Sequence, residues 1–286
     1  MDGFIAVDWG TTNRRVYLIA DGAVIETERD DRGVASKPDF RAEINAIRGR
    51  FGNRPIVMAG MVGSSIGWHE APYVAAPAGL GDLAAQCPRL DDRVYIVPGV
   101  SRIDATGPDV MRGEEVQLLG AAEAGLVPPD ALLIQPGTHC KWAELRAGRI
   151  ARFTTAMTGE LFAMLGRESI LAPQMSGQVT TGDAFIAGVD AGLERDLSAA
   201  LFGVRARGLL GLLPADDAPS YVSGLLIGAE ISARFAEYEG ALVHILADPH
   251  LGALYAAAIR QAGRDAAEVD SRAAFVCGID RIESLL

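Results

Sequence analysis

An aspartate, a glycine and three small polar residues come together near the start of the chain. Asp8 stands at the end of an apolar run, and the residues that follow it include Gly10, Thr11, Thr12 and Asn13. A turn of this kind directs several N–H groups to one side and forms a concavity that binds anions. A carboxylate beside a bound phosphate can hold a divalent cation through water. The pattern predicts a site for phosphate and metal. A hairpin whose polar residues only form the turn would have the same sequence pattern.

A second glycine-threonine pair follows an apolar run in the middle of the chain. The stretch ALLIQPGTHCKWAEL places Gly137-Thr138 on Gly10-Thr11 when the two apolar runs are aligned. In this alignment Lys141 falls on Arg14, and His139 directly follows the glycine-threonine pair. A chance match of this length is the alternative. If the similarity of the two stretches is real, it predicts two similar domains that each contribute a glycine-threonine turn to a shared cleft. Clefts between domains are common ligand sites.

Charged side chains gather after a predicted strand that ends at Val100. These residues are Arg102, Asp109, Arg112, Glu114 and Glu115. The stretch from Asp109 to Glu115 predicts the start of a helix, where the helix dipole favours acidic residues. Charged groups that follow a strand are also placed where α/β proteins carry out chemistry. The cluster is therefore either a helix cap or part of a site.

Two glycine-rich segments allow other groups to approach the backbone closely. In the loop GMVGSSIGW, Ser64 and Ser65 offer hydroxyls and Trp68 offers a stacking face for a ligand. A connector with Trp68 packed on the core is the structural alternative. Gly224 and Gly228 lie four residues apart in a predicted helix, where they permit close contact within a core or between two copies of the chain.

Length and composition predict a two-domain protein. The chain has 286 residues, of which 49% are hydrophobic. Pro128-Pro129-Asp130 is the best boundary signal, so we predict domains at residues 1–127 and 128–286. A net charge of −11 argues against nucleic-acid binding, which needs a basic surface. No apolar run approaches the roughly 20 residues that cross a bilayer, and this predicts a cytoplasmic protein without a membrane partner.

Several longer motifs resemble one known family. The opening AVDWGTTNRR resembles the first phosphate motif of the sugar kinase, Hsp70 and actin superfamily, and PGTHCKW resembles the second. AGMVGSSIGW, VMRGEEVQLLGA, MTGELF, GDAFIAG, VRARGLLGLLP and SGLLIGAE resemble the 2-dehydro-3-deoxygalactonokinase family within it. The resemblance implies an α/β fold of two ribonuclease H-like domains, with mixed sheets flanked by helices. This is the actin-like ATPase and sugar-kinase architecture, with ATP in a cleft between the domains.

The resemblance also implies roles for individual residues. Asp8 would hold Mg²⁺ through water. The phosphates and ATP would be bound by Gly10, Thr11, Thr12, Asn13, Gly137, Thr138, His139, Lys141 and Gly224. Glu114 would be the general base, with Asp109 as the alternative. Arg112 or Arg102 would bind the substrate carboxylate, and Ser64, Ser65 and Trp68 would shape its pocket. The stretch ILADPHLGALY, at residues 245–255, is the weakest match and corresponds to the adenosine motif.

The activity implied by the resemblance is an ATP-dependent kinase. It would phosphorylate the terminal hydroxyl of 2-dehydro-3-deoxy-D-galactonate to give the 6-phosphate, in galactonate catabolism. Three alternatives stay open at this point. They are a kinase for the epimeric 2-dehydro-3-deoxygluconate, an ATP-hydrolysing chaperone-like or polyphosphate enzyme on the same scaffold, and a non-catalytic sensor of nucleotide or sugar acid. A homodimer is a possible assembly.

Overall fold

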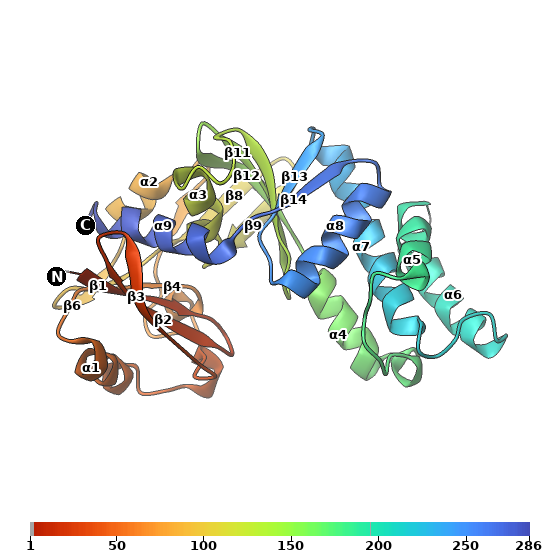
Figure 1. The fold of residues 1–286 in the computed structure, drawn as a ribbon, viewed down its shortest axis with the longest axis horizontal. Coiled ribbons are helices and arrows are strands. Elements are labelled where there is room, and N and C mark those ends of the chain that lie inside the picture. The colour runs from red at the N-terminus through yellow and green to blue at the C-terminus, as the bar shows by residue number, and fades with distance from the viewer. Residues whose placement is uncertain (1–2, 195) are drawn as a thin grey trace. The chain divides into compact units, whose positions relative to one another are not determined.

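A computed structural model describes residues 3–194 and 196–286, which form two compact units (Figure 1). The first unit runs to Asp130 and also includes Leu145–Phe153 and Asp270–Leu286. The second unit consists of Ala131–Glu144 and Thr154–Val269. The domain boundary between residues 127 and 128 stays a prediction.

The first unit is built on a mixed sheet of six strands. In spatial order they are β3 (Ala23–Asp30), β2 (Arg14–Ala20), β1 (Gly3–Trp9), β4 (Ile56–Ala59), β7 (Val94–Ile96) and β6 (Arg89–Asp91). Strand β1 pairs antiparallel with β2 and parallel with β4, so the carboxyl ends of β1 and β4 lie at one edge. A smaller sheet holds β5 (Tyr73–Ala75), β8 (Gly99–Asp104) and β9 (Gly107–Met111).

The second unit repeats this arrangement. Its sheet contains, in spatial order, β12 (Arg149–Ala156), β11 (Cys140–Arg146), β10 (Ala131–Gln135), β13 (Leu242–Ile245) and β14 (Asp265–Glu268). The end of β11 and the part of β12 up to Phe153 are grouped with the first unit. As in the first unit, the first strand lies beside the second, and on its other side it pairs parallel with a later strand. The duplicated architecture predicted from the two glycine-threonine turns is confirmed.

Helices complete both units. The first unit contains α1 (Phe40–Phe51), α2 (Leu80–Ala85), α3 (Glu114–Glu123) and α9 (Ser271–Glu283). The second contains α4 (Thr158–Glu168), α5 (Asp183–Glu194), α6 (Leu197–Leu209), α7 (Ala218–Glu237) and α8 (Pro249–Gln261). Short 3₁₀ turns occur at Val34–Ser36, Met61–Gly63 and Ala172–Gln174. The predicted α/β class with mixed sheets is confirmed.

Each unit buries its own apolar core. In the first unit, Ile5 and Val7 of β1 and Met58 of β4 are fully buried and belong to one cluster with residues of α1. In the second, Trp142 of β11 and Ile245 of β13 belong to a cluster with residues of α7 and α8. Continuous burial of β1 from Phe4 to Val7 is expected for a central strand that is covered on both faces. The residues at its carboxyl end are therefore rigidly positioned.

The predicted helix start with acidic residues in its first turn is confirmed, because α3 begins at Glu114 and Glu115 follows it. Asp109 lies ahead of the helix on β9, opposite Arg102 of β8. Asp104 pairs with Gly107, so a two-residue turn closes a β8–β9 hairpin ahead of the helix.

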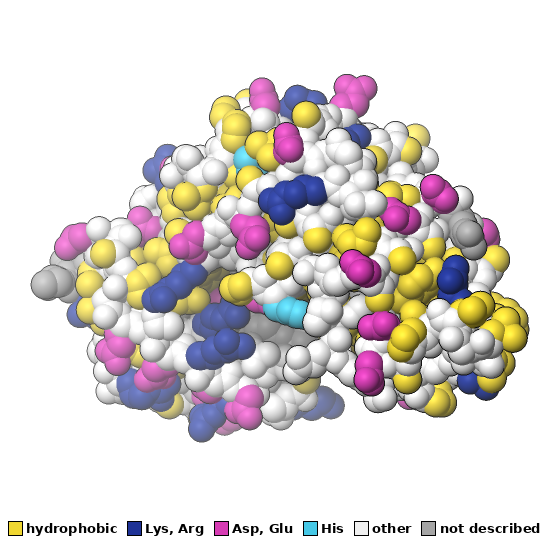
Figure 2. Space-filling view, turned by 45° about the vertical axis from the view of Figure 1, so that its right-hand side comes forward, with side chains coloured by type: hydrophobic (Ala, Val, Ile, Leu, Met, Phe, Trp, Pro, Cys, Tyr) yellow, Lys and Arg dark blue, Asp and Glu magenta, His cyan; other side chains and the backbone are white. Residues whose placement is uncertain are grey.

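The surface carries charges of both signs. On the face shown in Figure 2, acidic and basic side chains are scattered among one another rather than segregated. Among residues 3–194 and 196–286, no helix combines the length and apolar character needed to span a membrane.

Candidate functional site

The turn between β1 and β2 is held in place by a segment about 20 residues further along the chain. The carbonyl groups of Gly10, Thr11 and Thr12 accept hydrogen bonds from the backbone N–H groups of residues 33–35, at 3.0 to 3.2 Å. Within the turn, the Gly10 N–H group donates to the Asn13 carbonyl at 2.9 Å. The side chains of Thr11, Thr12 and Asn13 are exposed. The turn therefore combines a fixed backbone with an exposed polar face.

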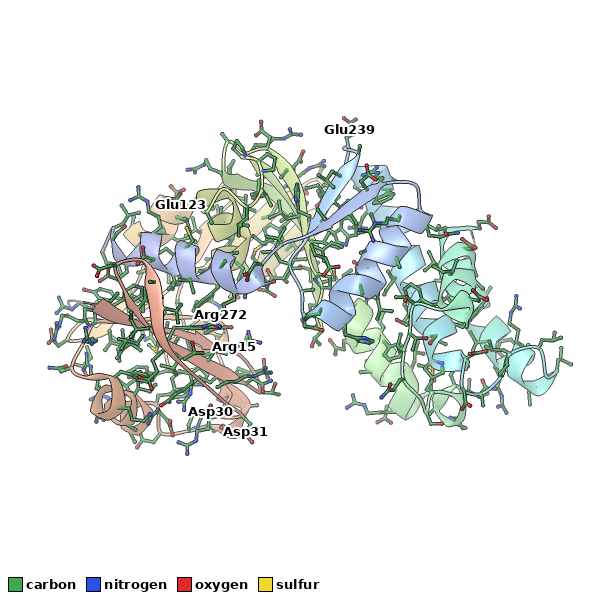
Figure 3. All side chains as sticks on the ribbon, viewed as in Figure 1. Arg15, Asp30, Asp31, Glu123, Glu239 and Arg272 are labelled. Atoms are coloured by element: carbon green, nitrogen blue, oxygen red, sulfur yellow. The ribbon has the colours of Figure 1, made fainter. Side chains whose placement is uncertain are left out.

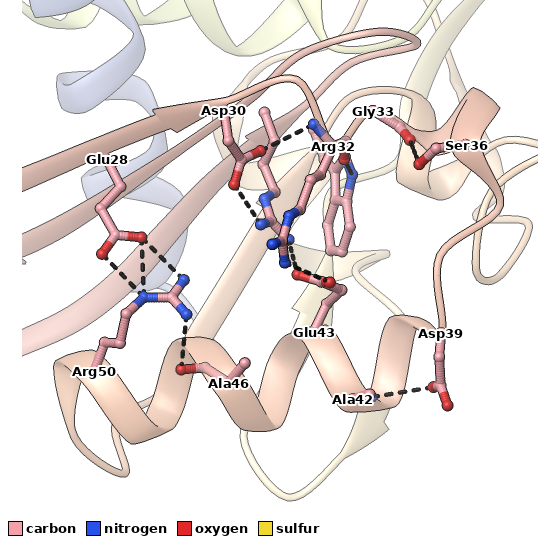
Figure 4. Close-up of polar contacts among 12 residues, drawn as sticks. Glu28, Asp30, Arg32, Gly33, Ser36, Asp39, Ala42, Glu43, Ala46 and Arg50 are labelled. Carbon is pink, nitrogen blue, oxygen red and sulfur yellow. Dashed lines mark hydrogen bonds and ion pairs between the residues drawn. The ribbon is translucent and has the colours of Figure 1, made fainter.

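A buried arginine anchors this turn to the rest of the first unit. Arg14 is 1% exposed, and its guanidinium group forms ion pairs with Asp30 at 2.6 Å and Glu43 at 2.8 Å. It also stacks on the ring of Trp9, and Arg32 donates to Glu43 from the other side (Figure 4). These partners compensate for removing the charge of Arg14 from water. Arg14 therefore has a structural role: it fixes the start of β2, the strand that follows the turn.

Asp8 lies at the carboxyl end of β1, across from Arg15 on β2. Its carboxylate is 3.3 Å from an Arg15 guanidinium nitrogen, and Arg15 projects from the strand toward solvent (Figure 3). Burial raises the pKa of Asp8, while the neighbouring Arg15 charge opposes this rise. Its position at the sheet edge that carries the turn places the ionised carboxylate where it can interact with a cation.

The donor set at Asp8 fits magnesium that is bound together with a phosphate. In the described part of the chain, no three His, Cys, Asp or Glu side chains gather to form a metal cage. Magnesium in phosphate sites keeps several waters and uses one or two carboxylates together with substrate phosphates. A single carboxylate next to a polar turn meets this requirement.

Two glycines bring the start of α3 to the same edge. Gly60, after β4, and Gly113, before α3, both have positive φ values, 96° and 106°. A β-carbon on Gly60 would lie 2.8 Å from the Trp9 carbonyl oxygen, and one on Gly113 would lie 3.0 Å from the Gly60 α-carbon. Only glycine combines this backbone conformation with such close approach. Glu114, the first residue of α3, is thereby brought to the carboxyl ends of β1 and β4.

The three candidate bases have different environments. Glu115 is fully buried, and its carboxyl group accepts hydrogen bonds from the Gly113 N–H group at 2.7 and 2.9 Å. Burial, together with the charge of Glu114, raises the pKa of Glu115 to about 8, so Glu115 is mostly protonated at neutral pH. Glu114 is half-buried and accepts from the Arg112 N–H group at 3.0 Å. This arrangement favours Glu114 over Glu115, while Asp109 lies on the β8–β9 hairpin.

The two candidate arginines also differ. Arg112 is 8% exposed, donates to the Ala71 carbonyl at 2.8 Å and stacks 4.2 Å from the centre of the Tyr73 ring. Its Nε and Nη1 atoms are buried, and no described residue accepts a hydrogen bond from them. Arg102 is ion-paired with Asp104 in its own hairpin, and one of its nitrogens, Nε, is likewise buried without an acceptor among the described residues, against two for Arg112. Buried donors without acceptors cost free energy, so Arg112 is the better candidate for binding an anionic ligand.

The glycine-rich loop after β4 has partners within the first unit. The Ser64 hydroxyl donates to the Met61 carbonyl at 2.7 Å, and the half-buried Trp68 stacks on Phe40 with ring centres 6.1 Å apart. Ser65 is exposed. One face of Trp68 therefore packs on the core, and contact of Ser64, Ser65 and Trp68 with a substrate stays a prediction.

The second glycine-threonine turn, Gly137 to His139, is tied to the start of α4. The Glu160 N–H group donates to the Thr138 carbonyl at 2.9 Å, and the Glu160 carboxylate lies 2.6 Å from Nε2 of His139. Lys141 is 5% exposed, and its ammonium group donates to a threonine hydroxyl on β12. Thr138 and His139 are exposed, whereas Lys141 is held inside the second unit.

A cavity of about 190 Å³ opens beside this turn. It lies where β10 and β13 end, since Gly137 follows β10 and α8 begins after β13. Asp248 caps α8 and accepts hydrogen bonds from the N–H groups of His250 and Leu251. The lining is mostly apolar, with a few hydroxyls and one imidazole, and consists of Gly137, Thr158, Gly159, Phe162, Val179, Ser223, Leu226, Ile227, His250, Leu251, Leu254 and Tyr255. Such a cavity suits a flat, partly apolar ligand.

Comparison with known protein families covers almost the whole chain. The model of the 2-keto-3-deoxy-galactonokinase family matches residues 8–282. The chain belongs to this family. A 2-dehydro-3-deoxygalactonokinase of Escherichia coli (strain K12) is 37% identical over 287 residues, which span 98% of this chain and 97% of that protein.

Solved structures agree with the assignment to the 2-keto-3-deoxy-galactonokinase family. A crystal structure from Sinorhizobium meliloti, provisionally described as a 2-dehydro-3-deoxygalactonokinase, is 35% identical and has a TM-score of 0.91. It covers 98% of this chain and 97% of its own. Component A of (R)-2-hydroxyglutaryl-CoA dehydratase from Acidaminococcus fermentans shares the fold, with a TM-score of 0.54 at 10% identity over 100% of this chain and 99% of its own.

Several residues of the cavity were not predicted from the sequence of this family member. Thr158, Ser223 and Tyr255 line it. Thr158 and Ser223 lie within motifs that carry the family resemblance, and Tyr255 lies in the weakly matching stretch at residues 245–255. Gly224, which was predicted, is instead packed against α5, because a β-carbon there would lie 2.1 Å from the Phe185 carbonyl oxygen. A contact between Gly224 and nucleotide stays a prediction, whereas the neighbouring Ser223 is part of the cavity wall.

Proposed function

We propose that this protein transfers a phosphoryl group from ATP to the terminal hydroxyl of 2-dehydro-3-deoxy-D-galactonate, giving the 6-phosphate in galactonate catabolism. Membership of the 2-keto-3-deoxy-galactonokinase family supports this activity. The structural observation that carries it is the repeated strand order, in which β1 and β10 each lead into a glycine-threonine turn. Duplicated turns of this kind suit a chain of phosphates, which needs donors from more than one direction.

The nucleotide contacts follow from the two turns and the cavity. Thr11, Thr12 and Asn13 of the first unit and Gly137 to His139 of the second donate to phosphate oxygens, while Gly10 shapes the first turn through its hydrogen bond to Asn13. The cavity beside Gly137 takes the adenosine portion, since its apolar walls and few polar groups suit a base and a ribose. Asp8 would hold magnesium through water, and the ion would supply positive charge that stabilises the phosphates during transfer.

The sugar-acid contacts lie in the first unit. Glu114 accepts the proton of the terminal hydroxyl, because it is the carboxylate at the start of α3 that is only half-buried. Arg112 binds the substrate carboxylate with its buried Nε and Nη1 donors. Ser64, Ser65 and Trp68 shape the pocket around the sugar chain.

An ADP-release assay tests the proposed activity. Purified protein with magnesium and ATP is given 2-dehydro-3-deoxygalactonate, its gluconate epimer, both in competition, or no acceptor. We expect ADP release that depends on the acceptor and a higher kcat/KM for the galactonate-derived acid. Faster turnover of the epimer would reassign the substrate. ADP release that is independent of any acid would reject the kinase function, and nucleotide binding without turnover would indicate a sensor.

Replacing Arg112 tests the binding of the substrate carboxylate. We expect Arg112→Lys to raise the KM for the sugar acid roughly 10- to 100-fold, because a hydrogen bond to a charged group contributes about 1.5–3 kcal/mol and lysine cannot form the bidentate pair. The KM for ATP should change little. Arg102→Lys, made in parallel, should have the smaller effect, since Arg102 is paired with Asp104. A larger rise for Arg102→Lys would show that Arg102 binds the carboxylate.

A further inference from the structure

A buried glutamate on α7 has no part in the proposed chemistry. Glu230 is 8% exposed, and its carboxylate accepts three hydrogen bonds from side chains on three other elements. Trp142 Nε1 of β11 donates at 2.5 Å, the Tyr255 hydroxyl of α8 donates at 2.8 Å, and the Thr158 hydroxyl of α4 also donates. A buried charge is tolerated only when such donors satisfy it. Glu230 is therefore the shared acceptor that joins four elements of the second unit.

Two of these three donors are part of the cavity wall. Thr158 and Tyr255 both line the cavity that we assign to the adenosine portion of ATP. The hydroxyls of both residues converge on the same carboxylate oxygen, Oε2, so Glu230 sets their spacing. The third donor, Trp142, fixes the carboxylate from the other side through Oε1.

The hydrogen bond between Thr158 and Glu230 also links Glu230 to the glycine-threonine turn at Gly137 to His139. Thr158 is the first residue of α4, and two residues later the Glu160 N–H group donates to the Thr138 carbonyl. Trp142 belongs to β11, the strand that leads away from this turn. Glu230 thus holds both the element that contacts the turn and the strand that continues from it.

We propose that Glu230 is a positioning residue for the nucleotide: it holds Thr158 and Tyr255 so that the cavity wall and the Gly137–His139 turn are formed before ATP binds. The proposal rests on the assignment of the cavity to nucleotide. A preformed site avoids the entropy cost of ordering side chains on binding. Loss of Glu230 therefore weakens nucleotide binding selectively, while the sugar-acid contacts in the first unit are unaffected.

The variant Glu230→Gln tests this role with little change of shape. When the amide oxygen accepts from Trp142, the amide NH2 group faces the two hydroxyls, which can accept from it but lose the acceptor for their own protons. In the opposite orientation the NH2 group faces the Trp142 N–H donor. We expect the Kd for ADP and the KM for ATP to rise about tenfold, as for the loss of about 1.4 kcal/mol. The KM for the sugar acid should stay within about twofold of the wild-type value. A variant that was only partly folded would lose kcat and keep both KM values.

Further variants separate positioning from general stability. Glu237→Gln makes the same substitution on the same helix, at a surface residue paired with Arg234, and should leave all constants unchanged. Tyr255→Phe keeps the ring and removes one hydroxyl bonded to Glu230, so it should raise the Kd for ADP. The double variant should show less than the sum of the two effects, because both act through one contact.

The outcomes distinguish this proposal from the proposed function. Normal ADP affinity in Glu230→Gln, with wild-type protein that binds ADP, would overturn the role of Glu230 and leave the kinase assignment intact. An equal rise in the KM values of ATP and sugar acid would also overturn it. Failure of the wild-type protein to bind ADP would reject the nucleotide cavity, and this proposal with it.

Discussion

Asp8→Ala is expected to abolish turnover in a protein that stays folded. Asp8 is the carboxylate at the end of β1 beside the polar turn, and its loss removes the group that we propose for magnesium. The fold should survive, because the partner of Asp8 is Arg15, whose side chain is 44% exposed, and an ion pair of this kind contributes about 0–1 kcal/mol. Steady-state ADP release and urea-induced unfolding, measured on the same preparation, check both expectations.

Arg15→Ala is the matched control. It breaks the same ion pair but keeps the Asp8 carboxylate, so its free energy of unfolding should resemble that of Asp8→Ala while its turnover stays within a few fold of wild type. Near-normal turnover of Asp8→Ala would refute the proposed role of the carboxylate. Equal loss of turnover in both variants would assign the effect to the ion pair instead.

Glu114→Gln should lower kcat roughly 10²-fold or more, the typical contribution of a general base. The amide keeps the shape of Glu114 and an oxygen that can accept from the Arg112 N–H group, but it cannot take up a proton. The KM values should change less than kcat, because the lost interaction belongs to the transition state. Saturating initial rates with both substrates provide the measurement.

Two neighbouring acids make this test specific. Glu115→Gln replaces a carboxyl group that is already mostly protonated at neutral pH, so its kcat should stay near the wild-type value. Asp109→Asn changes a residue of the β8–β9 hairpin and should also have a minor effect. If Asp109→Asn lowered kcat roughly 10²-fold and Glu114→Gln retained its kcat, the base would be Asp109.

Local patterns were enough to predict the elements around the turns. Four consecutive apolar residues before Asp8, and a similar run before Gly137, indicate buried strands because such runs need cover on both faces. Strand β14, in contrast, reads DAAE and carries no β-branched or aromatic residue, so its pairing with β13 comes from tertiary context. The β8–β9 hairpin that contains Asp109 has the same cause, since it depends on pairing between two strands.

Adjacent residues were sufficient to predict the two glycine-threonine turns, because turns and strand ends are encoded locally, and the resemblance of longer motifs indicated the kinase family. Only the tertiary structure showed how the environment of Glu114 differs from that of Glu115, and that of Arg112 from that of Arg102. Those differences depend on burial and on partners distant in sequence: Ala71 for Arg112, and Gly60 for the start of α3. The link from Glu230 to Trp142, 88 residues away, likewise exists only in the folded chain, where a buried carboxylate must find its donors.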